Sequence, residues 1–291
     1  MICWSAFKIL CALGFGLNVA ALMSWVERKQ SAVIQDRIGA NRAEVFGFRL
    51  LGLFHILSDT IKMLTKEDFE PPAGIRPWHT LAPIVSMACA ALCLAALPFG
   101  DVIAYAGRTW SLTPLPLDYG VLFVLALLSI GVHGVVMAGW SSGSNYALLG
   151  GLRGAAQMIS YEVAMLAILA GPLFLYGTLD LTEAARWQAR TLGGVLPAWG
   201  LFLQPLAFIL FMTAGAAETK RAPFDLPEGE SEIVGYFVEY SGMKFGMFLT
   251  TDFLESIVLA GLATALFLGG WHVPGLRHMG LPQPVFALLG V

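Results

Sequence analysis

The chain has 291 residues, of which 57% are apolar and 13% charged, and its mean hydropathy is +0.72. These values exclude an ordinary soluble domain and indicate a protein that crosses a membrane several times. The formal net charge of -3 and the lack of a basic tract argue against a nucleic-acid partner.

Six apolar runs of about 20 residues are each long enough to cross a bilayer as a helix. They cover residues 9–26, 80–99, 118–140, 155–177, 196–217 and 244–271. A seventh run opens at Gln283 and reaches only Val291, so the chain is either cut or natively short. The sequence therefore predicts an all-α fold, a polytopic transmembrane helix bundle. It is a single integral membrane domain over residues 1–291, with six complete spans and the start of a seventh.

The distribution of Lys and Arg predicts the orientation, because these residues are retained on the cytoplasmic side of a membrane. Placing residues 27–79, 141–154 and 218–243 on one side, with Lys244 at its edge, collects 12 of the 17 cations. They are Arg28, Lys29, Arg37, Arg42, Arg49, Lys62, Lys66, Arg76, Arg153, Lys220, Arg221 and Lys244. We therefore expect the N-terminus outside, with the loop 27–79 and the acidic loop 218–243 in the cytoplasm.

The loop 27–79 contains a predicted amphipathic helix. Its polar residues fall on one stripe, and its apolar residues cover much of the remaining surface. The stripe consists of His55, Ser58, Asp59, Lys62 and Lys66, and the apolar residues are Leu53, Phe54, Leu57, Ile61 and Leu64. This pattern favours a helix at the membrane interface over a span. It leaves open whether the helix only rests on lipid or also borders a site.

The four cysteines do not have the spacing of a metal or iron–sulfur site. Cys89 and Cys93 lie four residues apart inside an apolar run, and Cys3 and Cys11 are eight apart. We interpret them as small apolar residues in helices, and expect no metal or redox centre in this chain.

Ionisable residues inside the apolar runs are candidates for function, since a charge in the bilayer is costly. Glu162 lies about two turns into the fourth run, and we expect it to face the protein interior, either as a relay group or hydrogen-bonded to a neighbouring helix. A lone histidine such as His133 in the third run is more often a hydrogen-bonded packing residue than a proton carrier. Asp252 and Glu255 lie either within the sixth run or at its inner mouth. The segment before Glu162, rich in Ser and Gly, is expected to be a tight cytoplasmic turn.

The stretch 218–244 concentrates charge between two apolar runs, with six carboxylates and three cations. Pro223 and Pro227 require a turn, after which a helix is expected to restart near Glu228. Such a helix would place Glu228, Glu232, Tyr236 and Glu239 on one face. Carboxylates this close repel one another, so they bind cations or remain partly protonated, as a proton path requires.

The motifs of soluble enzymes are absent: the sequence has no Walker loop, no dinucleotide fingerprint, no HExxH and no nucleophile elbow. The remaining candidate chemistry is an apolar scaffold with buried acids and two charged loops.

Six motifs together resemble one membrane-subunit family of respiratory NADH:quinone oxidoreductase, complex I, known as the H subunit or NADH dehydrogenase subunit 1 family. They are ERK at 27–29, R-x-G-x-N at 37–41, D-x-I-K-x-x-x-K-E at 59–67, GWSSGS-x-Y-x-LLG-x-LR at 139–153, SYE at 160–162 and ET-x-RAPFDLPEGESE at 218–232. The sequence departs from the family pattern at Ala40 and Ile56, where the family has Pro, at Asn145, where it has Lys, and at Lys220, where it has Asn.

The resemblance implies a subunit that is not catalytic alone and that walls a quinone tunnel in the bacterial inner membrane. It implies that the other membrane and hydrophilic-arm subunits are partners, that iron–sulfur clusters and FMN reside in them, and that quinone is the substrate. The implied quinone-binding residues are Arg28, Arg37, Asp59, Arg221, Phe224, Asp225 and Glu228. The implied proton-relay residues are Glu162, Glu218, Glu230, Glu232 and Glu239.

Two alternatives remain open from the residues. One is the equivalent membrane subunit of an energy-converting hydrogenase or another ferredoxin-driven complex, which need not bind quinone. The other is a free-standing ion carrier in which Glu162 and the acidic loop bind cations directly.

Overall fold

The computed structural model describes residues 2–44, 47–105, 108–192, 196–221, 223–227 and 235–272, and most of them are helical. The helices are α1 (Ile2–Ile34), α2 (Phe54–Thr65), α3 (Arg76–Ala96), α4 (Gly120–Ser141), α5 (Asn145–Tyr176), α6 (Leu181–Trp187), α7 (Gly200–Leu203), α8 (Pro205–Glu218) and α9 (Gly242–Phe267), with a 3-10 turn, η1, at Leu50–Gly52. Two short antiparallel hairpins pair β1 (Val102–Tyr105) with β2 (Arg108–Ser111), and β3 (Thr191–Leu192) with β4 (Leu196–Pro197). The predicted all-α membrane bundle is confirmed.

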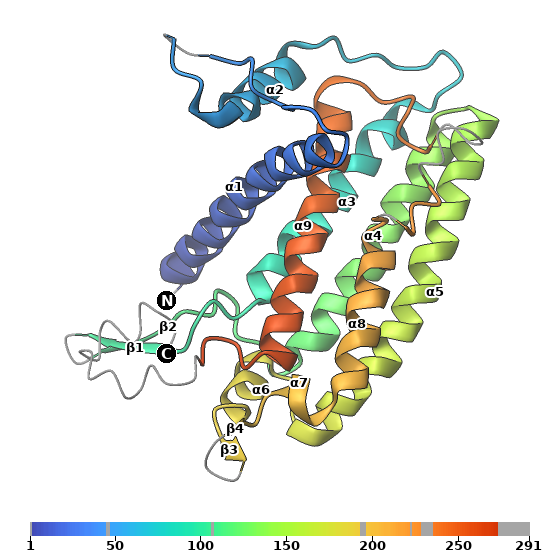
Figure 1. Ribbon diagram of the computed structural model, residues 1–291. Coiled ribbons are helices and arrows are strands. Elements are labelled where there is room, and N and C mark those ends of the chain that lie inside the picture. The colour runs from blue at the N-terminus through green and yellow to red at the C-terminus, as the bar shows by residue number, and fades with distance from the viewer. Residues whose placement is uncertain are drawn as a thin grey trace.

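Helices α3, α4, α5, α8 and α9 stand side by side, and α9 contacts both α3 and α8 (Figure 1). Helix α1 leans against α9 and α3 at the edge of the bundle, and α2 lies across the end of α1. We call this end of the molecule the α2 end. The two hairpins and the short helices α6 and α7 lie at the opposite end.

Within the described residues, five helices are long and apolar enough to cross a membrane: α1, α3, α4, α5 and α9. The predicted fifth span, 196–217, is instead broken, and α8 has 14 residues. Pro205 explains the break, because proline disfavours helical backbone in the residue before it, and Gln204 has φ -138° and ψ 63°. The expected start of a seventh span at Gln283 lies outside the described residues.

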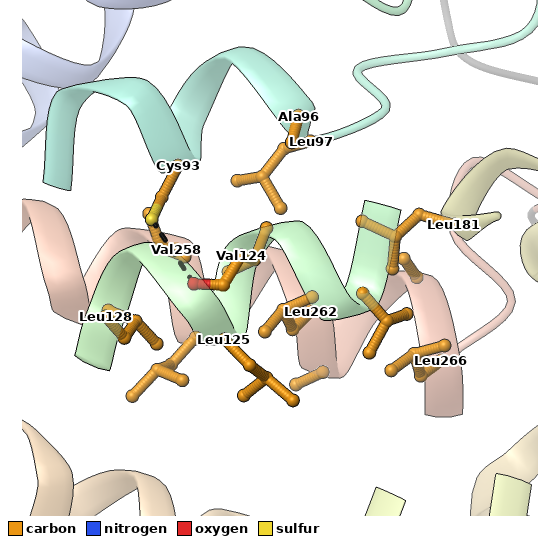
Figure 2. Close-up of a cluster of buried hydrophobic side chains, with 14 of the residues drawn as sticks. Cys93, Ala96, Leu97, Val124, Leu125, Leu128, Leu181, Val258, Leu262 and Leu266 are labelled. Carbon is orange, nitrogen blue, oxygen red and sulfur yellow. Dashed lines mark hydrogen bonds between the residues drawn. The ribbon is translucent and has the colours of Figure 1, made fainter. Parts of the chain in front are cut away.

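The core of the bundle is built from Leu, Val, Ala and Cys side chains of α3, α4 and α9. Figure 2 shows Cys93, Val124, Val258 and Leu262 among them, with the Cys93 thiol directed at the carbonyl oxygen of Val124, 3.7 Å away. Both Cys89 and Cys93 are buried, in agreement with their interpretation as small apolar residues.

The contact between α3 and α4 depends on a missing side chain. A Cβ atom at Gly134 would lie 2.0 Å from the Ser86 hydroxyl oxygen and 2.9 Å from the Ala82 carbonyl oxygen. Only glycine allows this approach, and it packs the two helices closely beside α9.

Helix α2 is a surface helix, as its sequence predicts, and it contains no buried residue. Its apolar residues Leu57, Ile61 and Leu64 are 54%, 52% and 65% exposed. The chain before it is held tightly, since Gly52 has φ +89° and a Cβ there would lie 1.9 Å from the Ala40 carbonyl oxygen. The turn around Ala40 therefore rests against the start of α2.

Two sequence predictions about local structure are wrong. The segment 141–154 is not mainly a turn, because α5 begins at Asn145 and only Ser142–Ser144 connect it to α4. The helix expected to run from Glu228 through Glu239 does not include Tyr236–Glu239, which form a turn after Gly235 at φ +85°. Residues 228–234 lie outside the described residues.

A buried amide joins three elements at the end opposite α2. Gln188, which is 0% exposed, donates to the carbonyl oxygens of Ala184 and Ala265 at 3.2 and 2.8 Å. Its Oε1 accepts from the backbone N–H groups of Gly200 and Gly269 at 3.1 and 3.0 Å. One side chain therefore connects α6, α7 and α9.

We expect Gln188→Met to lower the melting temperature of the detergent-solubilised protein. The change removes four hydrogen bonds of about 0.5–1.5 kcal/mol each and leaves buried backbone groups without partners. The measurement is loss of folded protein on heating. The same substitution at exposed Gln30 is the matched control, and equal melting temperatures for the two variants would contradict this role of Gln188.

Candidate functional site

Three adjoining cavities lie at the α2 end, between α1, α2, α9 and the acidic loop. Cavity A, of about 570 Å³, and cavity B, of about 300 Å³, share Arg28 and Leu249. Cavity C, of about 710 Å³, shares Glu27, Ser31 and Phe253 with cavity A. The shared residues place cavity A between the other two.

Helices α1 and α2 are joined at the border of cavities A and B by an ion pair. Arg28 Nη1 lies 2.5 Å from Asp59 Oδ2, and the two side chains are 42% and 30% exposed. Partly exposed pairs contribute little to stability. The pair nevertheless fixes a guanidinium group where it borders both cavities.

Cavity C combines a charged end with an apolar wall. Arg221 Nη1 pairs with Glu27 at 2.8 Å, and its guanidinium carbon lies 4.6 Å from the centre of the Phe253 ring. The wall from α1 consists of Val19, Leu22, Met23 and Val26. Such a combination suits a molecule with an apolar body and a polar ring.

Phe224 is held next to these cavities by α5. The side-chain amide of Gln157 donates to the carbonyl oxygens of Phe224 and Ala217, at 2.5 and 2.7 Å. The Phe224 ring packs edge-on against Tyr161, with ring centres 5.8 Å apart. Gln157 is 5% exposed, and its two hydrogen bonds tie the acidic loop and the end of α8 to α5.

A group of buried and half-buried carboxylates lies on α5, α8 and α9. Glu218 is 0% exposed, and among the described residues neither of its oxygens has a hydrogen-bond partner. Glu255 is 4% exposed, and its Oε2 also has no partner there. Glu162 is half-buried and accepts a hydrogen bond from Ser129 on α4. The charges of Glu255 and Glu162 both act on Glu218.

Lys220 lies between this group and cavity C. Its Nζ is 2.7 Å from Asp252 Oδ1 and 3.3 Å from the Tyr236 hydroxyl, and its side chain is 6% exposed. Burial alone would lower the pKa of Lys220, but Asp252, Tyr236 and Glu255 together raise it well above its ordinary value. Burial also raises the pKa of Tyr236. The lysine therefore remains a buried cation.

A second ionic cluster attaches the segment before α3 to α9. Lys244 pairs with Asp68 at 2.9 Å and with Glu70 at 3.4 Å. The hydrogen bond from Arg76 lowers the pKa of Glu70. Beside this cluster, the ring of Tyr240 lines cavity B, and burial raises its pKa to about 12. The cluster thus holds the wall of cavity B in place.

The structure brings most of the predicted quinone-binding residues to one place. Arg28 and Arg37 line cavity A, Arg28 and Asp59 line cavity B, and Arg221 and Asp225 line cavity C. Phe224 lines none of the three. Glu228, predicted for the same site, lies outside the described residues.

Of the predicted relay residues, Glu162 lies on α5 and Glu218 at the end of α8, and these two helices contact each other. Glu239 lies in the turn before α9, and Glu230 and Glu232 lie outside the described residues. His133 is exposed, and its ring contacts only the Ser129 carbonyl oxygen of its own helix among the described hydrogen bonds.

Sequence reasoning missed the roles of Gln157, Lys220 and Tyr236, and left the position of Glu255 open. Glu255 could have been recognised as an acid in the middle of a 26-residue apolar helix. The partners of Gln157 and Lys220 depend on contacts between distant segments, for which the sequence carries no local signal. Within the described residues, no group of three or more His, Cys, Asp or Glu is placed to hold a metal ion.

Comparison with known proteins identifies the family. Residues 7–290 match the family described as NADH dehydrogenase. The first H subunit of NADH-quinone oxidoreductase from Geobacter metallireducens is 47% identical over 262 residues, which cover 89% of this chain and 76% of that protein. The corresponding H subunit of Solibacter usitatus is 40% identical over 99% of this chain and 72% of its own length. The H subunit of Thermomicrobium roseum is 45% identical over 93% of this chain and 81% of its own.

The motif-based resemblance and the comparisons agree. With five helices able to cross a membrane and this degree of identity over most of its length, the chain is a membrane protein that belongs to the NADH dehydrogenase family, alongside the H subunits of NADH-quinone oxidoreductase.

Proposed function

We propose that this chain is the membrane subunit of a proton-pumping NADH:quinone oxidoreductase, and that it forms the wall of the quinone site at the α2 end. The observation that supports this most is the convergence of Arg28, Arg37, Asp59, Arg221 and Asp225 on three adjoining cavities. These residues come from segments far apart in the sequence.

The chemistry of the cavities suits a quinone. Its ring oxygens accept hydrogen bonds, which the guanidinium groups of Arg28, Arg37 and Arg221 are able to donate. Its apolar tail requires a wall such as the α1 face of cavity C, and Phe253 offers an aromatic surface between cavities A and C. Phe224 and Glu228 of the acidic loop are assigned to the same site on the family resemblance alone.

The buried carboxylates provide a route for coupling. Reduction of a quinone adds negative charge and then takes up protons, which changes the charge balance of acids nearby. Glu218 and Glu162 interact with each other, and Glu218 lies two residues before Lys220 at the cavity wall. We assign the relay to Glu162 and Glu218, continued by Glu230, Glu232 and Glu239 in the acidic loop.

The proposed function also implies where the chain lies and which subunits it contacts. It lies in the bacterial inner membrane with the N-terminus outside and the acidic loop in the cytoplasm, in contact with other membrane and hydrophilic-arm subunits. The chain itself binds no cofactor and catalyses nothing alone. Electrons reach the quinone from FMN and iron–sulfur clusters held by the partner subunits.

The test is to purify the chain with an affinity tag from membranes in mild detergent and identify what accompanies it. We expect NADH-oxidising flavoprotein and iron–sulfur subunits, together with NADH:quinone reductase activity. A nickel-binding large subunit instead would assign the chain to a hydrogenase complex. Isolation as a lone oligomer that conducts protons in vesicles would overturn the proposal.

A further inference from the structure

Lys220 is unusual in its environment. It follows the last turn of α8 in the left-handed conformation common at helix C-termini, with φ +54°, and the N–H of Arg221 bonds back to the Ala216 carbonyl oxygen at 3.1 Å. Its ammonium group is buried against Asp252 and the Tyr236 hydroxyl, and it lies 5.5 Å from the centre of the Tyr236 ring. A buried cation that also borders a cavity points to a role beyond packing.

Among the described residues, Asp252, Glu255 and Glu218 all interact with the charge of Lys220. Glu218 is acted on by Glu255, Glu162 and Lys220, and Glu255 by Lys220 and Asp252. The charge of Lys220 thus acts on both Glu218 and Glu255. Glu218 has no hydrogen-bond partner among the described residues and Glu255 has an unpartnered oxygen, so both carboxylates are sensitive to the position of the Lys220 ammonium group.

The same side chain reaches the cavity. Lys220 lines cavity C together with Arg221 and Asp225, and Arg221 is already engaged by Glu27. A negative charge placed in cavity C thus meets Lys220 as a buried cation with one carboxylate partner, and the flexible lysine stem allows the ammonium group to shift.

We propose that Lys220 is a positioning residue that couples an anionic occupant of cavity C to the charge of the partly buried Asp252 and of the buried carboxylates Glu255 and Glu218. This rests on the proposed function, because the anionic occupant is a quinone that has gained electrons. Attraction toward the occupant weakens the contact with Asp252, and the carboxylates lose their counter-charge. A buried acid without a counter-charge favours its neutral, proton-bearing form.

The test compares Lys220→Met with Lys220→Arg in membrane vesicles that contain the whole complex. The methionine keeps the length of the side chain and removes its charge, whereas arginine keeps the charge. We expect Lys220→Met to lower the number of protons moved per electron at least about twofold, and Lys220→Arg to retain most of it. Equal ratios in wild type and Lys220→Met would overturn the proposal. A general packing role would change the amount of complex or its turnover rather than this ratio.

A second variant is needed in case Lys220→Met does not assemble, since that change leaves the partly buried Asp252 without its ion-pair partner. Lys220→Met combined with Asp252→Asn removes both charges, and we expect it to assemble and still move fewer protons per electron. A normal ratio in this double variant would overturn the proposal.

Arg28→Ala tests the proposed function separately from the role of Lys220. Unchanged quinone reduction in Arg28→Ala defeats the proposed function itself, whereas reduced quinone reduction there with a normal ratio in Lys220→Met defeats only the role of Lys220.

Discussion

Arg28→Ala is expected to lower NADH-driven quinone reduction about tenfold or more. The Arg28 guanidinium borders cavities A and B and is held there by Asp59 at 2.5 Å. A hydrogen bond to a charged group contributes about 1.5–3 kcal/mol, and about 1.4 kcal/mol corresponds to a factor of ten in affinity. The measurement is the rate of quinone reduction by membranes as a function of quinone concentration.

Two comparisons make this result specific. Oxidation of NADH by an artificial acceptor, which takes electrons before they reach the quinone, should be unchanged. Arg49→Ala is the matched control, because Arg49 is also paired with an acid, Glu44 at 3.0 Å, but lines none of the three cavities. Equal losses in both activities would mean that Arg28→Ala damages assembly and does not act on quinone.

Glu162→Gln is expected to leave the complex assembled and to lower proton translocation about tenfold or more, as for a positioned group that transfers protons. The amide oxygen of glutamine still accepts the hydrogen bond from Ser129, so the contact between α4 and α5 persists. The amide cannot exchange a proton at neutral pH, which removes the charge that acts on Glu218. The measurement is protons moved per electron in sealed vesicles, with the amount of assembled complex determined in parallel.

The control for this variant is Glu183→Gln at the opposite end of the bundle. Glu183 accepts a hydrogen bond from Thr178 at 3.0 Å at an exposed position, and its replacement should leave the ratio unchanged. Wild-type pumping per electron in Glu162→Gln would rule out a relay role for this residue.

The long apolar runs predict the bundle well, because length and hydropathy are local properties of the chain. Helices α3, α4 and α9 lie close to the predicted runs, and the polar stripe of α2 identified a surface helix. The break before α8 could not be predicted in this way. An apolar run carries no information on whether Pro205 begins a new helix or sits inside a continuous one.

Local reasoning failed where distant contacts determine the backbone. Ser- and Gly-rich sequence favours a turn in isolation, yet α5 begins at Asn145, since Gly150 and Gly151 allow close contact with Gly235 and Gly139. Tyr236–Glu239 form a turn, with Tyr236 buried beneath Lys220 and its ring packed against Phe248. The helical spacing of the acids predicted a helix here and not a turn.

The sequence predicted which residues belong to the candidate site better than it predicted which residues they pair with. Arg28, Asp59 and Arg221 were identified from motifs, and the structure adds that each pairs with, or lies beside, a residue from another segment. The pairing of Lys220 with Asp252 joins residues 32 apart across a loop, and only the packed helices determine it.

Gln157 has a mechanical consequence for the assembly. Its amide grips the loop at Phe224 and the end of α8 at Ala217, and it precedes Glu162 by five residues, about 7.5 Å along the α5 axis. Moving the loop away would leave the buried Gln157 amide without a hydrogen-bond partner, which costs about 1–3 kcal/mol of stability. A ligand that displaces the loop therefore also acts on α5 and α8 through these hydrogen bonds. These are the helices that carry Glu162 and Glu218.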